Sequence, residues 1–157
     1  MKIRKAKKED MKDIQDLRYL LAKHDKSLGL DIAVTEWGYT EVGKKDLEYF
    51  LNEQYIYVAE ENEKIVGFIT AEIFKKKAWY TVQLGSINNI FVLEEYRNQG
   101  IGKALMKTAI DALKEVGITN VQLDTYNKNY KAIKFYEGLG FEKCNLQMLY
   151  QEDKKKE

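Results

Sequence analysis

A six-residue segment with two glycines, Arg-Asn-Gln-Gly-Ile-Gly at residues 97–102, constrains the fold more than any other part of the chain. It follows an extended apolar run at residues 87–93 and precedes a stretch with helical periodicity at residues 101–116. Glycines at a strand-to-helix junction let the backbone approach a ligand closely. The first turn of the helix then offers unpaired N–H groups at the positive end of the helix dipole. The segment therefore predicts a binding site for a phosphate or pyrophosphate.

The pattern of apolar residues predicts one mixed α/β domain over residues 1–150 and a charged tail at residues 151–157. Helical spacing predicts helices at residues 8–22, 44–52, 101–116 and 129–138. Extended runs predict strands at residues 2–6, 55–60, 64–74, 79–93, 121–126 and 141–150. Asn88 and Asn89 have poor β-propensity and predict a break or bulge inside the fourth run. Residues 24–43 show no clear period and are expected to form a mobile loop.

Composition excludes several classes of protein. The 157 residues are 45% hydrophobic and 32% charged, which is typical of a soluble globular domain. A formal net charge of +1 gives no support to nucleic-acid binding, and no apolar run approaches the roughly 20 residues of a membrane span. The start of the chain lacks the apolar stretch of a signal peptide, and Cys144 is the single cysteine, so a cytoplasmic location is expected. Cys144 is expected to be buried, and with the lone His24 it makes no metal site.

Two motifs, in this order and on these elements, resemble the GNAT superfamily of acetyl-CoA-dependent N-acetyltransferases. The segment at residues 97–102 looks like the Arg/Gln-x-x-Gly-x-Gly/Ala motif of that family. Residues 129–141, Asn-Tyr-Lys-Ala-Ile-Lys-Phe-Tyr-Glu-Gly-Leu-Gly-Phe, look like its Asn-x-x-Ala…Tyr-Glu-x-x-Gly-Phe element. The resemblance spans about residues 2–150. It implies a twisted, mainly antiparallel sheet of six to seven strands with helices on both faces, splayed between strands four and five.

The resemblance implies acetyl-CoA as cosubstrate and no metal. The cofactor-binding residues that it implies are Ile90, Phe91, Val92, Arg97, Asn98, Gln99, Gly100, Ile101, Gly102, Lys103 and Asn129. Main-chain N–H groups of the turn are expected to form an anion nest, from which a side chain at Gly100 or Gly102 would displace the ligand. Arg97 either contacts the cofactor or braces the turn. Asn129 binds the cofactor arm, caps the helix that follows, or does both.

Other readings of the glycine segment were weighed on the same residues. An isolated Gly-x-Gly motif is often a helix N-terminus without a ligand. A Walker loop requires Gly-Lys-Ser/Thr, but Ala104 follows Gly102 and Lys103. A dinucleotide fingerprint requires a third glycine where this chain has Leu105, and no early parallel βαβ unit supports it. The second motif therefore decides the interpretation in favour of coenzyme A.

Acetyl transfer needs an oxyanion hole, a proton donor for the departing thiolate and a neutral amine. Main-chain N–H groups of residues 90–92 are expected to polarise the thioester carbonyl. Tyr136 matches the family position that often protonates the thiolate, although it is also placed to be a core aromatic. The base is Asp124, Glu72 or an ordered water chain. Asn88 stands where many members of the family have Glu, so a base on that strand is not expected.

The acceptor is expected to lie opposite the cofactor, against the first two helices and the loop between them. Acidic and aromatic residues of that loop could bind a cationic amine, namely Asp31, Glu36, Trp37, Tyr39 and Glu41. The predicted function is transfer of acetyl from acetyl-CoA to a primary amine, either a small molecule or a protein N-terminus. A non-catalytic acyl-CoA-binding regulatory domain is the alternative, and a homodimer is suggested by the resemblance alone.

Overall fold

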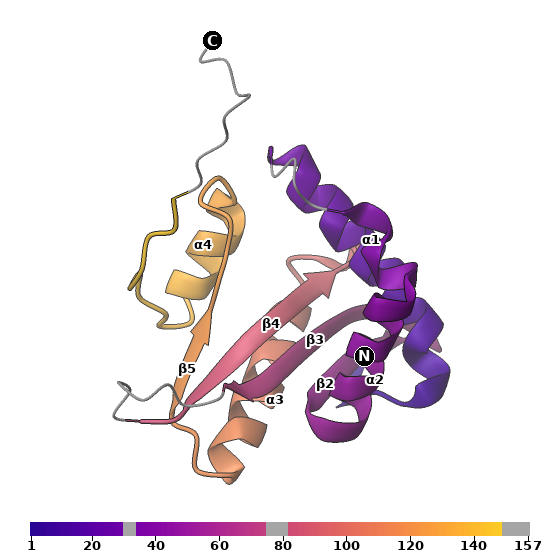
Figure 1. Ribbon diagram of the computed structural model, residues 1–157, viewed down its shortest axis with the longest axis horizontal. Helices are drawn as coiled ribbons and strands as arrows, with labels where there is room; N and C mark the ends of the chain where they lie inside the picture. The colour runs from indigo at the N-terminus through magenta and orange to yellow at the C-terminus, as the bar shows by residue number, and fades with distance from the viewer. Residues whose placement is uncertain (30–33, 75–81, 149–157) are drawn as a thin grey trace.

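The computed structural model describes residues 1–29, 34–74 and 82–148 (Figure 1). In these residues the strands form one sheet in the order β1-β2-β3-β4-β5. The strands are β1 (Lys2–Lys5), β2 (Tyr55–Glu61), β3 (Lys64–Phe74), β4 (Leu84–Val92) and β5 (Asn120–Leu123). Neighbouring strands pair antiparallel except β4 and β5, which are parallel. A parallel pair requires a crossover, and α3 (Ile101–Glu115) supplies it.

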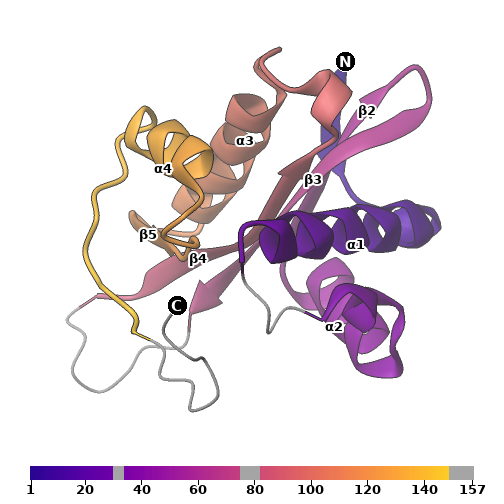
Figure 2. The ribbon, with the colours of Figure 1, turned by 90° about the horizontal axis from the view of Figure 1, so that it is seen from above.

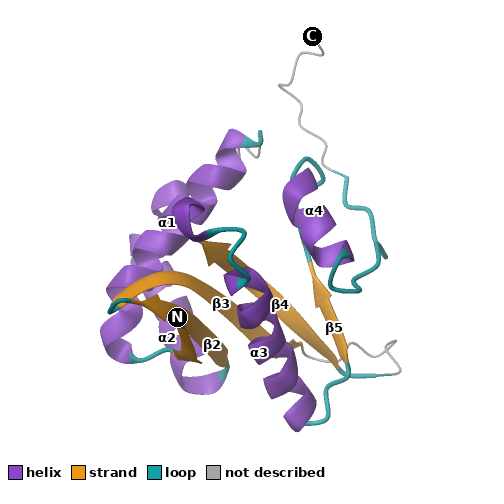
Figure 3. Ribbon diagram, turned by 180° about the vertical axis from the view of Figure 1, so that it is seen from behind, coloured by secondary structure: helices purple, strands orange, loops and turns teal. Residues whose placement is uncertain are grey.

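Helices cover both faces of this sheet, as expected. Figure 2 shows α1 (Met11–Ser27) and α2 (Glu41–Glu53) on one side of the strands and α3 on the other. The last helix, α4 (Tyr130–Glu137), lies beside β5 (Figure 3). Three short 3-10 helices join these elements, η1 (Lys8–Asp10), η2 (Thr35–Tyr39) and η3 (Glu94–Tyr96). Among the described helices none has the length and apolar character needed to cross a membrane.

The hydrophobic core lies in two layers because consecutive residues of a strand point to opposite faces of the sheet. On β3, Phe68 packs with Ile14 of α1 and Leu47 of α2, whereas Ile69 packs with Leu105 of α3. All five side chains are fully buried. Burial of a side chain of this size contributes about 1.5–3 kcal/mol. The two layers therefore fix α1 and α3 on opposite sides of β4, which is the strand that positions the candidate site.

The break expected at Asn88 and Asn89 is confirmed as a β-bulge. Thr70 of β3 pairs with Asn89, but the next residue, Ala71, pairs with Ile87. Asn88 is thus an extra residue on β4, and the neighbouring Asn89 N–H donates to the Thr70 hydroxyl at 3.0 Å. A bulge bends its strand and increases the local twist.

The opening expected between the fourth and fifth strands is also present. The parallel pairs run from Leu84 with Asn120 to Ile87 with Leu123, where β5 ends. β4 continues to Val92, so residues 88–92 keep one strand edge that no described strand pairs. Figure 1 shows α1 and α4 rising on either side of this end of β4. This unpaired segment of β4, residues 88–92, is called the open edge below.

Several sequence expectations differ from the structure. The sheet has five strands in the described part of the chain, so six to seven strands are not confirmed. The strand expected at residues 141–150 is wrong for 141–148, because residues 142–148 are exposed and no described strand lies beside them to complete a ladder. The loop expected at residues 24–43 is wrong at its ends, because α1 continues to Ser27 and η2 and α2 begin by Glu41. Residues 75–81 of the expected fourth run and the tail at 151–157 lie outside the described residues.

Candidate functional site

The glycine turn between β4 and α3 forms an anion cradle. Asn98 and Gly100 have φ of 61° and 81°, and Gly100 is the N-cap of α3. The first helical hydrogen bond runs from Ala104 N–H to the Gly100 carbonyl at 3.0 Å. The amides of residues 101–103 precede that bond and have no helical acceptor. A Cβ built on Gly100 would meet no atom within 4 Å, so the space in front of these amides is open to a pyrophosphate.

Gly102 has a different role from the one predicted. A Cβ at Gly102 would lie 3.3 Å from Cζ of Phe135 on α4, a distance tighter than an ordinary contact. The absent side chain therefore faces the neighbouring helix and lets α3 and α4 approach each other. The expectation that a side chain here would displace the ligand is corrected, although the Gly102 N–H still belongs to the cradle.

Polar side chains of the turn brace it from below. Arg97 Nε donates to the Val92 carbonyl at 2.9 Å, and its guanidinium carbon lies 5.3 Å from the centre of the Phe91 ring. Gln99 Nε2 donates to the Glu95 carbonyl at 3.2 Å. These contacts tie the turn to the end of β4 and to η3. The bracing alternative for Arg97 is thus observed.

Register decides which main-chain groups the open edge presents. Leu93 N–H donates to the Val66 carbonyl of β3 at 2.9 Å. Because antiparallel pairing alternates, Phe91 also directs its N–H and C=O to β3, whereas Ile90 and Val92 direct theirs to the open edge. The predicted contacts from Ile90 and Val92 fit this geometry. The register does not support a main-chain contact from Phe91.

Asn129 caps α4. Its side-chain oxygen accepts the Ala132 N–H at 3.2 Å, and its carbonyl accepts the Ile133 N–H. The capping alternative is therefore confirmed, and a contact with the cofactor arm stays a prediction. Lys103, also predicted to bind the cofactor, is exposed in the first turn of α3.

Tyr136 lies on α4 in an aromatic cluster. Its ring centre is 5.4 Å from that of Phe135 and 6.1 Å from that of Phe141. Burial, with the negative charge of Asp25 adding to it, raises the pKa of Tyr136 to about 12. The phenol therefore keeps its proton throughout the neutral pH range, as a proton donor must.

The two predicted carboxylate bases occupy different positions. Asp124 is exposed and directly follows the last residue of β5, at the mouth of the split between β4 and β5. Glu72 lies on β3, where its Oε1 accepts Asn88 Nδ2 at 2.6 Å. Asn88 thus engages a carboxylate on the neighbouring strand instead of supplying one.

A cavity of about 130 Å³ lies between α1, η2 and β4, on the face of the sheet expected to hold the acceptor. Its lining includes Arg18, Asp25, Trp37 and Asn89. Burial raises the pKa of the Asp25 carboxyl above its ordinary value, against the opposing effect of nearby His24. Arg18 and Asp25 were not predicted. The signal for Arg18 was its position four residues after Ile14, which places a charge on the buried stripe of α1.

Most residues predicted for the acceptor loop have partners within the chain. Tyr39 donates to Asp16 at 2.7 Å, and Glu41 pairs with Lys44 at 3.0 Å. Glu36 accepts the Thr35 hydroxyl. Trp37 alone of the predicted set lines the cavity, and Asp31 lies outside the described residues.

Cysteine and metal expectations have separate outcomes. Cys144 is exposed, so its predicted burial is wrong, because the strand that would have buried it does not form in the described residues. Among the described residues no group of three or more metal-ligating side chains comes together.

Comparison with known proteins establishes the family. A family model described as "Acetyltransferase (GNAT) family" matches residues 9–141. The chain therefore belongs to the GNAT acetyltransferase family, a family of acyltransferases with acetyl-CoA as cosubstrate. The resemblance inferred from the two sequence motifs is confirmed.

Individual relatives agree with this assignment. The chain is 31% identical over 104 residues to N-alpha-acetyltransferase 30 of Schizosaccharomyces pombe, which covers 65% of this chain and 67% of that protein. It is 36% identical over 87 residues to N-acetyltransferase family 8 member 2 of Rattus norvegicus, covering 55% of this chain. That match spans 38% of the rat protein, well under half of its length.

A solved relative shows the same fold. The aminoglycoside N-acetyltransferase AAC(6')-Iy, crystallised in complex with CoA, superposes with a TM-score of 0.77 at 21% identity. The match covers 97% of this chain and 94% of that one.

Proposed function

We propose that this chain is an N-acetyltransferase that moves the acetyl group of acetyl-CoA to a primary amine by direct attack in a ternary complex. The observation that carries the proposal is the continuity of the site. The anion cradle at Gly100 adjoins the open edge of β4, and Asn89 at the start of that edge lines the acceptor cavity on the opposite face. A cofactor held by the cradle and the edge would bring its thioester to the strand that reaches the acceptor.

Each residue of the site has a chemical task in this proposal. The cradle amides bind the pyrophosphate, and the Ile90 and Val92 main chains pair with the amides of the pantetheine arm. The neutral amine attacks the thioester carbonyl carbon, so that a C–N bond forms and the C–S bond breaks. An open-edge N–H stabilises the oxyanion. The amine gives one proton to a base, and the departing sulfur receives one from the Tyr136 hydroxyl.

A thiol-release assay tests this function. Purified protein is mixed with acetyl-CoA and a panel of amines and peptides, and free coenzyme A is followed with a thiol reagent. We expect thiol release that requires an amine, with the acetylated amine identified by mass spectrometry. Calorimetry with acetyl-CoA, run in parallel, separates the alternatives. Binding without turnover of any amine supports the regulatory-domain alternative, and absence of binding contradicts both.

For the base we propose Asp124, because it lies at the mouth of the split where the thioester would sit. We expect Asp124→Asn to lower kcat/KM by about 10²-fold and to remove the acidic limb of the pH–rate profile. The matched variants Glu72→Gln and Asp25→Asn test the other carboxylates near the site and should keep that limb. An unchanged limb in Asp124→Asn assigns the proton to one of those carboxylates or to water.

Several sequence expectations stay predictions here. The acceptor is a primary amine, and the printed names of relatives include enzymes of protein N-termini and of aminoglycosides. A cytoplasmic location and a homodimer rest on the sequence alone.

A further inference from the structure

Arg18 is a buried cation with half of its hydrogen-bonding capacity unused. The residue is 6% exposed on α1. Its Nη1 pairs with Asp46 of α2 at 2.9 Å and lies 3.5 Å from the Gly43 carbonyl. Its Nε and Nη2 are buried and have no hydrogen-bond partner among the described residues. Because a buried polar group without a partner is costly, the arrangement needs an explanation.

The geometry of the unused side of Arg18 indicates what it would bind. The guanidinium is planar, and Nε–H and one Nη2–H point in the same direction in that plane. This edge matches the two oxygens of a carboxylate. The Trp37 ring lies 5.6 Å from the guanidinium carbon, so it covers a face of the group and leaves the in-plane donors unsatisfied. The edge that pairs with α2 holds the group in place.

The cavity beside Arg18 carries the complementary charge. Asp25 lines the same cavity, and Asn89 links the cavity to the open edge of β4. A volume of about 130 Å³ is that of roughly four liquid waters, which suits a fragment with few heavy atoms. A small acceptor with an anionic end and a cationic end would thus meet an opposite charge at each end.

We propose that the Nε and Nη2 edge of Arg18 binds the carboxylate of the acceptor, and that the acceptor is a small amino acid or a compound with a free amino-carboxylate group. The inference rests on the proposed function and deepens it. The carboxylate on Arg18 orients the amine toward Asn89 and the open edge, and Asp25 attracts the ammonium form before the proton is lost. Peptide N-termini lack a free carboxylate at this distance and are poor acceptors.

Matched acceptors test the proposal on the unaltered protein. Amino acids, their α-amides and the corresponding simple amines are compared by thiol release, with rates expressed per neutral amine. We expect kcat/KM to fall by about 10- to 100-fold from each acid to its amide, the range expected for loss of a charge-assisted hydrogen bond. Amides or peptides that react as well as the free acids overturn the proposal.

Substitutions then assign the preference to Arg18. Arg18→Gln should erase the discrimination between acid and amide, whereas Asp46→Asn, which removes the partner of the other edge, should keep it. Thermal melting and acetyl-CoA calorimetry establish that each variant is folded, and the ratio in the parent stands even where Arg18→Gln is not. Retained discrimination in a folded Arg18→Gln contradicts the assignment.

The experiment also separates this proposal from the proposed function. Turnover of amines without a carboxylate preference overturns the Arg18 proposal and leaves acetyl transfer intact. If acetyl-CoA binds but no acceptor is turned over, calorimetry of the same acids and amides against the coenzyme A complex measures the preference directly. Equal binding of acids and amides then rejects it.

Discussion

Gly100→Asp is expected to weaken acetyl-CoA binding by about 100-fold while the protein stays folded. The aspartate side chain would enter the open space before the first turn of α3, where the pyrophosphate is proposed to lie. Two like charges about 5 Å apart repel by a few kcal/mol at an effective dielectric near 20, which corresponds to that factor. Aspartate tolerates a positive φ better than most residues, and its charge at a helix N-terminus favours the helix. Calorimetry with acetyl-CoA measures the effect.

The chain offers a matched control for backbone strain. Gly117 at the other end of α3 has φ of 86°, close to the 81° of Gly100, and a Cβ at either glycine would meet nothing within 4 Å. Gly100→Ala and Gly117→Ala should each cost about 1–2 kcal/mol of stability, whereas weaker acetyl-CoA binding is expected for Gly100→Ala alone. Normal affinity in Gly100→Asp, or equal losses in the two alanine variants, contradicts the cradle.

The fold was predictable where hydrophobic periodicity is strong. The limits of β3 agree with the predicted run at residues 64–74, and α3 begins at the predicted Ile101. The two asparagines predicted a bulge because their β-propensity is poor, and the register confirms it. The run at residues 141–148 failed because alternation shows that a strand is possible, but a strand also needs a neighbour to complete its hydrogen bonds. No property of that run shows whether a neighbour exists.

The site was predictable where main chain carries the function and less so where side chains meet across elements. A glycine turn before a helix determines its own geometry, so the cradle followed from local sequence. The partner of Gly102 did not, because Phe135 comes from a helix about thirty residues further along. Arg18 and Asp25 were missed for the same reason. Their significance depends on a cavity completed by η2 and β4.

Tyr136→Phe is expected to lower kcat by about 10²-fold with little change in acetyl-CoA affinity, as loss of a general acid would. Phenylalanine keeps the ring that packs on Phe135 and Phe141, so α4 should stay in place. Because the pKa of Tyr136 is raised to about 12, the hydroxyl holds its proton at every pH well below that value. The loss should therefore be uniform from about pH 6 to 10, which a pH–rate series in parent and variant measures.

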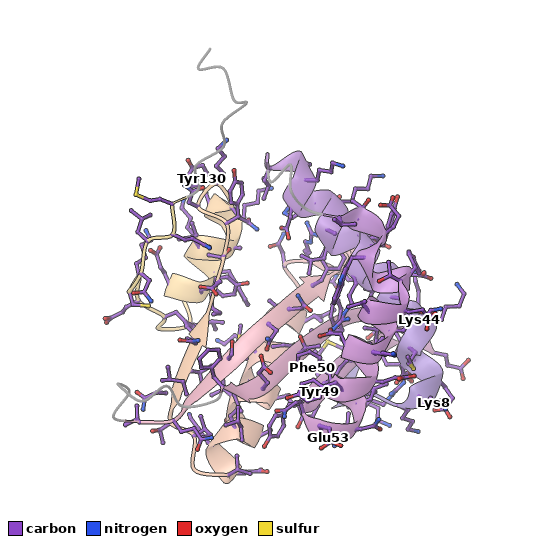
Figure 4. All side chains as sticks on the ribbon, viewed as in Figure 1. Lys8, Lys44, Tyr49, Phe50, Glu53 and Tyr130 are labelled. Atoms are coloured by element: carbon purple, nitrogen blue, oxygen red, sulfur yellow. The ribbon has the colours of Figure 1, made fainter. Side chains whose placement is uncertain are left out.

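Tyr130→Phe is the control on the same helix. Tyr130 is the first residue of α4 and is 69% exposed, and Figure 4 labels it at the outer end of that helix. Removal of its hydroxyl should leave kcat unchanged. Equal turnover in Tyr136→Phe and the parent rejects the proton-donor role. A fall in kcat accompanied by an equal fall in acetyl-CoA affinity points instead to a hydroxyl that positions the thioester, because a group that acts only on the departing sulfur contributes in the transition state and not in the bound ground state.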